Sequence, residues 1–550
     1  MAGAAAGAYV WPGPHDLIED VYSLQGGAVK MGFMDAVVPC SFGTNQPGVQ
    51  NAAEWLRVAY HDMATADVAA GTGGLDASIR FETARDENEG AAFNNTFGFM
   101  GGYYNAHVPL ADLIALGVVV AADRCGGPKI EFRAGRVDAA AAGAWGVPKP
   151  DQDLATHTAS FARQGFSKAD MIALVACGHT LGGVHHEDFP QVVGDPDANP
   201  GNVTQFEGGG SAAVFDNHVV TDYLDGTTQN PLVVSHNDTF NSDKRVFSAD
   251  ANTTVRALAD PAVFRATCAD VLARMINTVP AGVVLSEPIV PIDIKPYIDS
   301  LALTTSTDSS TNASAVAIAI SGRIRIRLDE DTSRNKADMK VDLVYADRSG
   351  RPVGVLIPTT LLTFRGGETD GLHGVRFAWF NFATEIDAAA GISGFTVRMT
   401  KPSTGAVTVF DNAGHPGGFP IDDSLLYQET QSCLLEQQLK HTLTVAAAVR
   451  TDRVQDPLSL DVNYKVSRLG ESFAPFLSTR SASLASTGRV VGDYTLFEVT
   501  VPMDEESWFS AEFDLALGGA AAGDGNDAAR QGTKLLRKMG SVLQRPCQAL

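Results

Sequence analysis

The feature that most constrains the fold of this chain is a change in hydrophobic periodicity near residue 285. Before it, apolar residues recur at steps of three and four, as in NAAEWLRVAYHDM and VPLADLIALGVVVAADRC, a pattern typical of amphipathic helices. After it, segments such as SAVAIAISGRIRIRLDED and GISGFTVRMT alternate apolar with polar residues and are joined by Gly, Asp and Asn turns. The change predicts a multidomain protein with a mostly α-helical domain followed by β-sandwich-like domains.

We predict three domains, because 550 residues are too many for one hydrophobic core. The helical domain covers residues 1–285, and the proline-marked segment after it is typical of a linker. The β-rich part repeats a similar order of strands, which predicts sandwiches over residues 286–432 and 433–550. The last stretch, AARQGTKLLRKMGSVLQRPCQAL, predicts an amphipathic helix that is packed or frayed at the end of the second sandwich.

Charge and processing signals limit the partners and the compartment. A net charge of −23 argues against nucleic acid and against an anionic membrane surface, and no apolar run is long enough to span a bilayer. The sequence begins without a signal peptide, yet six cysteines occur without zinc-like spacing. Sequons for N-glycosylation occur at Asn94, Asn202, Asn237, Asn252 and Asn312. We therefore expect a secreted, extracellular protein whose leader is missing from this sequence.

Arg57 and His61 lie four residues apart in LRVAYHDMAT and project from one face of the predicted helix. A histidine on a helix is more often a hydrogen-bonded structural residue than a catalytic one. A guanidinium and an imidazole directed at one cavity nevertheless suit the cleavage of a bond between two oxygens, because the imidazole moves the proton while the guanidinium stabilises the departing oxygen. That chemistry needs an iron on the opposite wall, and His179 in LVACGHTLGGVHH is the candidate ligand.

These motifs resemble the haem peroxidases of plants, fungi and bacteria over roughly residues 14 to 280, about half of the chain. LRVAYHD matches their distal helix, GGLDASIRFE their distal calcium loop and ALVACGHTLG their proximal helix. ENEG, FDN and NSDKRVFSAD complete the family's order. The chain combines a histidine typical of the intracellular relatives, His185, with Cys40 and Cys125, which match a disulfide of secreted fungal enzymes. This mixture resembles the hybrid peroxidases of ascomycete fungi.

The resemblance implies haem b as the cofactor and assigns roles to residues around it. Arg57 and His61 would act on hydrogen peroxide, with Asn88 holding His61 in the required tautomer. On the other side His179 would be the axial ligand of the haem iron, and Asp243 would accept a hydrogen bond from it.

The resemblance further assigns His185 to a haem propionate, and it places the position that is Trp or Phe in relatives near Gly208. Departures from the subfamilies limit the donor. Asp188 stands where ascorbate-using relatives employ an arginine, and Glu54 is the one carboxylate left of a manganese site. The expected donors are therefore small organic reductants at the haem edge.

The resemblance implies a distal calcium site of hard oxygen donors, the kind that calcium prefers. Its ligands would be Asp62, the carbonyl of Gly74, Asp76 and Ser78.

A second, proximal cation site keeps only part of the family's ligand set. Thr180 and Asp216 are present, whereas Gly209 and Ser211 replace the Asp and Thr of the secreted families. With one carboxylate fewer, this pocket is predicted to hold a monovalent cation, water or nothing.

Other predictions concern cysteines and one ion pair. Cys177 is predicted to be a buried free thiol, Cys268 has no clear partner, and Cys433 and Cys547 are candidates for a disulfide in the last β-domain. Asp123 and Arg136 are predicted to form a structural ion pair.

Two functions follow from the whole set. The first is a secreted haem peroxidase that reduces hydrogen peroxide and oxidises small phenolic donors through a ferryl intermediate. The second is a cell-wall or surface-binding protein whose β-domains carry the function, with a weakly active haem domain. Contact of the C-terminal domains with polysaccharide stays open.

Overall fold

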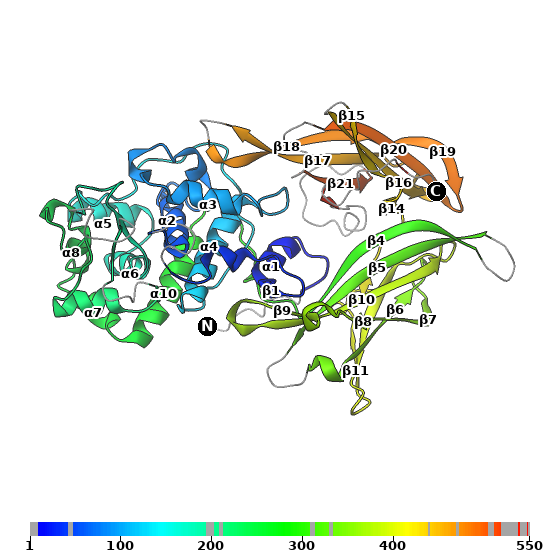
Figure 1. The fold of residues 1–550 in the computed structure, drawn as a ribbon, viewed down its shortest axis with the longest axis horizontal. Coiled ribbons are helices and arrows are strands. Elements are labelled where there is room, and N and C mark those ends of the chain that lie inside the picture. Colours follow the sequence, from blue (N-terminus) through cyan, green and yellow to red (C-terminus); the bar gives the residue numbers. More distant parts are fainter. Residues whose placement is uncertain are drawn as a thin grey trace.

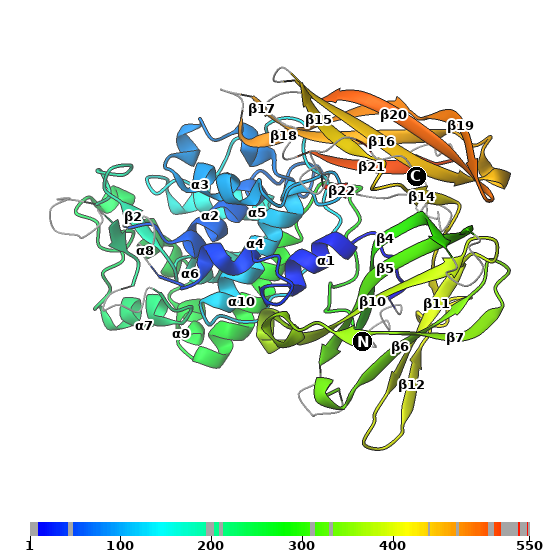
Figure 2. The same ribbon diagram turned by 45° about the vertical axis from the view of Figure 1, so that its right-hand side comes forward.

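The computed structural model describes residues 9–41, 48–193, 203–207, 213–307, 314–328, 334–437, 440–468, 472–503, 511–518, 537–538 and 547. Within these ranges a helical part lies beside two β-rich parts, as Figures 1 and 2 show. The transition predicted near residue 285 is confirmed, because helix α10 ends at Ile276 and strand β4 begins at Ile294. None of the described helices is long and apolar enough to cross a membrane.

The helical part is assembled around α4, whose residues from Leu110 to Ala122 are all buried. The distal helix α2 packs across α4, and α6 packs against α10. Helix α6 begins with a capping box in which Ser167 and Asp170 exchange side-chain and backbone hydrogen bonds. The helices are α1 (Asp16–Ser23), α2 (Asn51–Met63), α3 (Ala92–Met100), α4 (Leu110–Arg124), α5 (Leu154–Arg163), α6 (Lys168–Gly178), α7 (His218–Asp225), α8 (Ser242–Phe247), α9 (Thr253–Leu258) and α10 (Pro261–Ile276).

Two antiparallel sheets, here called the first sheet pair, enclose one apolar cluster that includes Ile326, Phe382 and Val397, and all their strands except β1 follow residue 285. One sheet has the order β1-β9-β10-β5-β4 with β8 beside β10, and the other has the order β12-β11-β6-β7 with β13 beside β11. Their bounds are β1 (Gly26–Gly27), β4 (Ile294–Thr307), β5 (Ser314–Leu328), β6 (Lys340–Ala346), β7 (Pro352–Pro358), β8 (Thr360–Leu361), β9 (Glu368–Asp370), β10 (Arg376–Asp387), β11 (Gly394–Thr400), β12 (Val407–Phe410) and β13 (Phe419–Pro420).

A second sheet pair follows, with the orders β14-β16-β20-β19, where β15 joins β16, and β18-β17-β21-β22. It encloses its own cluster, which includes Val445, Leu460 and Phe513. Its strands are β14 (Leu425–Tyr427), β15 (Cys433–Gln437), β16 (Lys440–Arg450), β17 (Leu458–Arg468), β18 (Ser472–Ser483), β19 (Ala485–Val491), β20 (Tyr494–Met503), β21 (Glu512–Leu517) and β22 (Arg537–Lys538). Strand β14 pairs with β16, although it precedes residue 433, and the exact domain limits stay a prediction.

Buried charges join the helical part to the first sheet pair. Glu19 and Asp20 of α1 form salt bridges with Lys295 of β4 and Arg325 of β5, and all four side chains are largely buried. Burial alone would raise the pKa of Glu19, but the two cations outweigh it and lower the pKa to about 2. Separating the helical part from the first sheet pair would therefore leave buried charges without partners, which is unfavourable.

Three predictions made from the sequence are corrected by the structure. The expected C-terminal helix is wrong at Arg537–Lys538, which form a strand paired with β21, while most of that stretch lies outside the described residues. Arg136 pairs with Asp112 at 2.9 Å, not with Asp123. Asp123 instead pairs with Arg124 and with His373 of the first sheet pair.

The third correction concerns Cys177, which is not a free thiol. It forms a disulfide with Cys268 of α10, and Cys40–Cys125 and Cys433–Cys547 form the other two. The sequence missed the Cys177–Cys268 pair because only the packing of α6 against α10 brings these two residues together. Of the predicted sequons, Asn202 and Asn312 lie outside the described residues.

Candidate functional site

Helix α2 carries the distal residues on a face that is partly accessible, although its opposite face is buried in the core. Arg57 donates a hydrogen bond to the carbonyl of Glu89 at 2.7 Å, and its guanidinium lies 5.0 Å from the ring centre of Phe93. The same ring meets the imidazole of His61 edge-on at 5.3 Å. Phe93 thus contacts both of the side chains that the sequence predicted to act together.

Asn88 fixes the tautomer of His61. The amide oxygen of Asn88 lies 2.7 Å from Nδ1 of His61, and its amide nitrogen donates to the carbonyl of Glu82 at 3.0 Å. Because the second bond directs the amide oxygen at the imidazole, Nδ1 carries the proton. Nε2 of His61 then presents a lone pair and makes no hydrogen bond with any residue of the described ranges.

The electrostatics of this pocket favour a neutral imidazole. Burial, together with the positive charge of Arg57, lowers the pKa of His61 to about 3, against a smaller opposite effect of the Asn88 bond. Exclusion of water also lowers the pKa of Arg57, to about 10, so this group stays charged at neutral pH. The pocket therefore combines a free base with a fixed cation.

On the other side, His179 follows directly after α6 and is held by a carboxylate. Its Nδ1 donates to Asp243 of α8 at 2.7 Å, and Asp243 is 1% exposed. The amide of Asn230 donates to the same carboxylate oxygen at 2.8 Å. The carboxylate makes the imidazole a stronger electron donor, and Asn230 keeps that carboxylate in place.

An aromatic ring lies against the imidazole of His179. Phe206 stacks on it with ring centres 4.3 Å apart and planes inclined by 15°. The sequence placed this position near Gly208, which lies outside the described residues. Phe206, two residues before that position, is the ring that the structure places against His179.

The donors present fit a haem group. Each of the two histidines has Nδ1 engaged by a neighbour, and Nε2 of neither one bonds to any described residue. The side chain of His179 is 30% exposed, although the carboxylate that orients it is buried. One imidazole free to coordinate iron, with a second imidazole and a guanidinium on another helix, is the donor set of a haem with one axial protein ligand.

The residues predicted for distal calcium come together around Asp62. Asp62 is fully buried and accepts hydrogen bonds from the backbone amides of Ala77 at 2.8 Å and Ile79 at 2.9 Å. Burial and the neighbouring carboxylate of Asp76 raise the pKa of Asp62, and burial raises that of Asp76. Neither carboxylate forms a salt bridge within the described part of the chain. Two buried acids without a protein cation fit a hard metal ion.

Ser78 and Gly74 complete the predicted distal set. The hydroxyl of Ser78 lies 3.5 Å from Asp62, and the amide of Ser78 donates to Asp76 at 3.0 Å. Gly74 adopts a φ of 113°, a conformation that glycine tolerates, and its amide donates to the hydroxyl of Thr65. This turn returns the loop to the end of α2.

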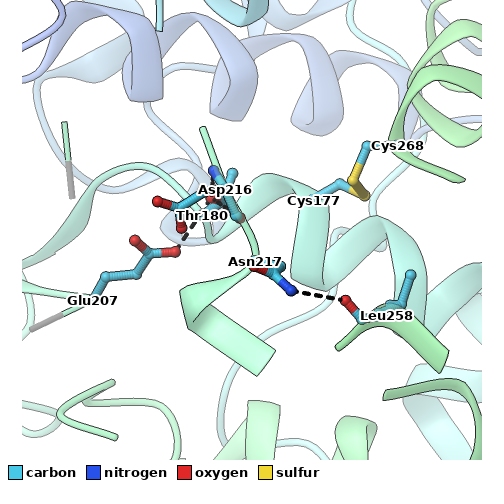
Figure 3. The surroundings of a disulfide bond; sticks show 7 residues. All are labelled: Cys177, Thr180, Glu207, Asp216, Asn217, Leu258 and Cys268. Atoms are coloured by element: carbon cyan, nitrogen blue, oxygen red, sulfur yellow. Dashed lines mark hydrogen bonds between the residues drawn. A yellow bond between two sulfur atoms is a disulfide. The ribbon is translucent and has the colours of Figure 1, made fainter. Parts of the chain in front are cut away.

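The proximal cation site has a carboxylate that the sequence analysis did not identify (Figure 3). Glu207 is 1% exposed, accepts a hydrogen bond from Thr180 at 3.2 Å and lies beside Asp216. Ligand atoms of Glu207, Asp216 and His218 lie within 4.8 Å of one another. Burial, and then the charge of Asp216, raises the pKa of Glu207 to about 9. The sequence analysis did not include Glu207, because it considered the positions of Gly209 and Ser211, both of which lie outside the described residues.

Acidic side chains lie near Arg57, namely Asp188, Glu54 and Glu89. Asp188 and Arg57 both approach Gly90, where a Cβ would lie 2.9 Å from the Asp188 carboxylate and 3.3 Å from the guanidinium. Burial lowers the pKa of His185, which belongs to strand β2 (Gly183–His185), and the charge of Asp188 opposes that effect. Glu54 accepts a hydrogen bond from Asn95 at 2.9 Å, and burial raises its pKa to about 7. A propionate role for His185 stays a prediction.

The sequence did not identify several residues of the site. Phe93 sits in an ordinary helical pattern, and Asn230 and Glu207 belong to loops without a motif, so their contacts follow from the tertiary fold. For Glu207, the signal available in the sequence was the carboxylate itself, next to the aromatic Phe206. The residues missed are Phe93, Phe206, Glu207 and Asn230.

Comparison with known proteins agrees with this geometry. The peroxidase family model matches residues 42–261. A WSC domain-containing protein of Arthroderma benhamiae is 37% identical over 522 residues, which are 94% of this chain and 66% of that protein. The peroxisomal L-ascorbate peroxidase 5 of Arabidopsis thaliana is 39% identical over 134 residues, which are 24% of this chain and 48% of that enzyme. A putative heme-binding peroxidase of Aspergillus fumigatus is 32% identical over 138 residues, or 24% of this chain and 42% of that protein.

The chain thus matches 66% of the length of the first of these relatives and less than half of the other two. The similarity to the first continues through both β-rich parts, whereas the similarity to the others is confined to a stretch of 134 to 138 residues. The helical part thus contains a peroxidase domain of the superfamily found in plants, fungi and bacteria, over residues 42–261.

Proposed function

We propose that this protein is a haem peroxidase that reduces hydrogen peroxide and oxidises small organic donors of the phenolic type. The observation that carries the proposal is the pair of imidazoles with Nδ1 engaged and Nε2 free, one held by an amide and the other by a carboxylate. The amide leaves His61 a neutral base, while the carboxylate makes His179 an electron-rich ligand. These are the two roles that peroxide cleavage at an iron centre requires.

The protein's own residues move one proton and stabilise one charge. Nε2 of His61 would accept the proton from one peroxide oxygen and return it to the other oxygen as the bond between them breaks. The guanidinium of Arg57 stabilises the negative charge that develops on the departing oxygen. Asn88 keeps Nε2 unprotonated beforehand. A haem held by His179 would supply the two electrons that reduce the peroxide.

Calcium at the distal loop belongs to the same proposal. Asp62, Asp76, Ser78 and the carbonyl of Gly74 supply hard oxygen donors at the end of the helix that carries His61. A divalent ion there would neutralise the two buried carboxylates and fix the orientation of α2. The second site is built from Thr180, Glu207 and Asp216. It also offers hard oxygen donors, so we propose that it binds a cation too.

The charges at the rim bear on the donor. Asp188 and Glu89 lie next to Arg57, and the whole chain carries a net charge of −23. Acidic groups at the entrance repel anions and attract cations. Neutral phenols and cationic aromatic amines are therefore the favoured donors, and anionic reductants are disfavoured.

Secretion is supported by three disulfides, which persist in oxidising compartments. Asn237 is an exposed sequon, which is accessible to glycosylation. The alternative function, binding to a cell wall or surface through the sheet pairs, is supported by the relative named for a WSC domain. Exposed apolar residues on the edge strands of the first sheet pair, Val353, Val355, Val407 and Val409, also favour some contact of that part.

The test is the absorption spectrum of the haem-loaded protein before and after one equivalent of hydrogen peroxide. The wild type should bind haem and change its spectrum within seconds, whereas His61→Leu should bind haem and react about 10²–10⁴-fold more slowly. His236→Leu, at an exposed histidine of the same domain, is the matched control and should react like the wild type. If the wild type binds haem but its spectrum does not change with peroxide, the catalytic proposal fails and the surface-binding alternative is favoured.

A further inference from the structure

Strand β18 of the second sheet pair packs against the two elements that shape the distal side of the peroxidase domain. In Figures 1 and 2 the ends of β17 and β18 lie beside α3. The other contacted element is the short helix η2 (Ser78–Phe81), which directly follows the loop around Asp62. Ala474 of β18 is fully buried and belongs to the apolar core of the peroxidase domain. A strand from a distant part of the chain is therefore part of the wall of the distal side.

Arg80 is the centre of this contact. It is 2% exposed, and its guanidinium lies 4.2 Å from the ring centre of Phe476 of β18. It donates hydrogen bonds to the carbonyls of Ala474 and Pro475 on the same strand. Within the described ranges it forms no salt bridge. The charge of Arg80 acts on the carboxylate of Asp138 without a salt bridge, and Tyr104 of the same domain accepts a hydrogen bond from it. Its other direct hydrogen-bond partners, the carbonyls of Ala474 and Pro475, belong to another domain, as does the ring of Phe476.

The same residue adjoins the proposed calcium loop. Asp62 receives its hydrogen bonds from the amides of Ala77 and Ile79, and Arg80 is the next residue along the chain. Phe81 adds a ring contact with Phe476 at 5.7 Å. A shift of β18 must therefore move the backbone that directs two amides at the buried carboxylate.

A second contact of the sheet pair holds α3. Lys465 of β17 donates to the carbonyls of Gly101 at 2.8 Å and Gly102 at 3.3 Å, just after the helix ends. A Cβ at Gly101 would lie 3.3 Å from Pro475, so strand and helix are in close contact. Helix α3 carries Phe93, which meets the imidazole of His61. Both contacts thus lead from the second sheet pair to the distal pocket.

We propose that the second sheet pair sets the calcium affinity of the distal loop, and that Arg80 is the positioning residue through which β18 acts. The inference rests on the calcium site proposed above. Since coupling between two binding events is reciprocal, calcium must also strengthen the docking of β18 on the peroxidase domain. The C-terminal part is then a component of the distal site and not only an attached module.

The first test needs no variant. Hydrogen exchange of the full-length, haem-loaded protein is measured with Ca²⁺ and with a chelator. Calcium should slow exchange of the amides of residues 77–81 and also those of Ala474, Phe476 and Leu477 on β18. Strand β12, far from the contact, is the internal control and should not change. Protection that is confined to the loop and absent from β18 would overturn the inference.

The second test is calorimetric titration of Ca²⁺ into the same protein and three variants. Phe476→Ala should weaken Ca²⁺ binding about tenfold, equal to about 1.4 kcal/mol. Phe476→Tyr should bind Ca²⁺ like the wild type, because the ring face over Arg80 is kept. The control is Val490→Ala, which removes a side chain that is 64% exposed on β19 of the same sheet pair and should leave the affinity unchanged.

The outcomes separate the inference from the proposal on which it rests. Equal affinities for the wild type and Phe476→Ala would refute the coupling while the calcium site stands. If the wild type binds no Ca²⁺, the calcium proposal fails and the coupling fails with it, while the haem spectrum of the same sample still reports on the peroxidase proposal. If Phe476→Ala does not fold, the exchange experiment on the wild type decides.

Discussion

The distal and proximal walls of the peroxidase domain present the same side chain in opposite chemical states. His61 on the distal wall is held at Nδ1 by the neutral amide of Asn88, and His179 on the proximal wall is held at Nδ1 by the carboxylate of Asp243. The two bonds have the same length, 2.7 Å, so the difference lies in the charge of the partner and not in the geometry. A neutral acceptor leaves a weak base ready for a proton, whereas an anionic acceptor raises the donor strength of a ligand.

The surroundings extend this contrast. On the distal side the positive charge of Arg57 acts together with burial to lower the pKa of His61. On the proximal side Asn230 anchors the carboxylate, and Phe206 covers the imidazole face. The distal wall is also supported by the second sheet pair, while the proximal wall is fastened by the disulfide between Cys177 and Cys268 (Figure 3). The distal wall is thus stabilised by a contact between domains and the proximal wall by a covalent bond.

Of the substitutions that test this difference between the two walls, removal of Arg57 should have the largest effect on the reaction with peroxide. Arg57→Leu is expected to slow the reaction with peroxide about 10²–10³-fold, because a group that stabilises developing charge is lost. The pKa of His61 should rise at the same time, since the neighbouring positive charge no longer lowers it. His61 must be neutral to accept a proton, so the acid limb of the rate profile should move to higher pH. Stopped-flow rates against pH measure both effects, and an unchanged acid limb would contradict the charge argument.

The two cation sites offer a comparison of stabilities. Asp62→Asn should abolish the stabilisation that Ca²⁺ gives the wild type through the distal site, which is about 2.7 kcal/mol at one hundred times the dissociation constant of that site. Glu207→Gln should keep this distal contribution, because Glu207 lies with Asp216 at the proximal site. Thermal unfolding with Ca²⁺ and with a chelator measures both. Equal losses in the two variants would show that the sites are not distinct in the way proposed.

Making the proximal wall resemble the distal one should have a smaller effect. Asp243→Asn replaces the carboxylate partner of His179 by an amide, and haem affinity is expected to fall about 10–100-fold. The reduction potential of the iron should become more positive, because the ligand donates less. Haem transfer to an acceptor protein and a redox titration measure these changes. Asp238→Asn, an exposed position in the same region, is the control and should change neither.

Making the distal wall resemble the proximal one should have the smallest effect on the reaction with peroxide. Asn88→Asp places a negative charge beside Nδ1 of His61, which favours the protonated imidazole and should raise its pKa by about 1 unit or more. The acid limb of the peroxide reaction should shift upward by the same amount, while the rate at alkaline pH should remain close to that of the wild type. A downward shift, or a loss of rate at every pH, would mean that Asn88 acts by position alone.

Much of the distal wall could be predicted from the sequence. Arg57 and His61 share one helix, where a spacing of four residues determines that they project from the same face. Asp62, Asp76 and Ser78 lie within 17 residues of one another, so a single loop brings them together. The boundary between helical and β-rich parts followed from periodicity alone, because the side-chain repeat of a helix differs from that of a strand.

Other features were decided only by the tertiary structure. Glu207 and Asn230 reach their partners through loops whose path no local pattern specifies, and the disulfide of Cys177 crosses 91 residues. Arg80 and Pro475 are 395 residues apart, and their contact depends on how the second sheet pair docks. Local spacing fixes what one helix or loop presents, since the backbone geometry repeats. Which side chains meet across domains depends on how whole elements pack, and there neighbouring residues carry no information about a partner hundreds of positions away.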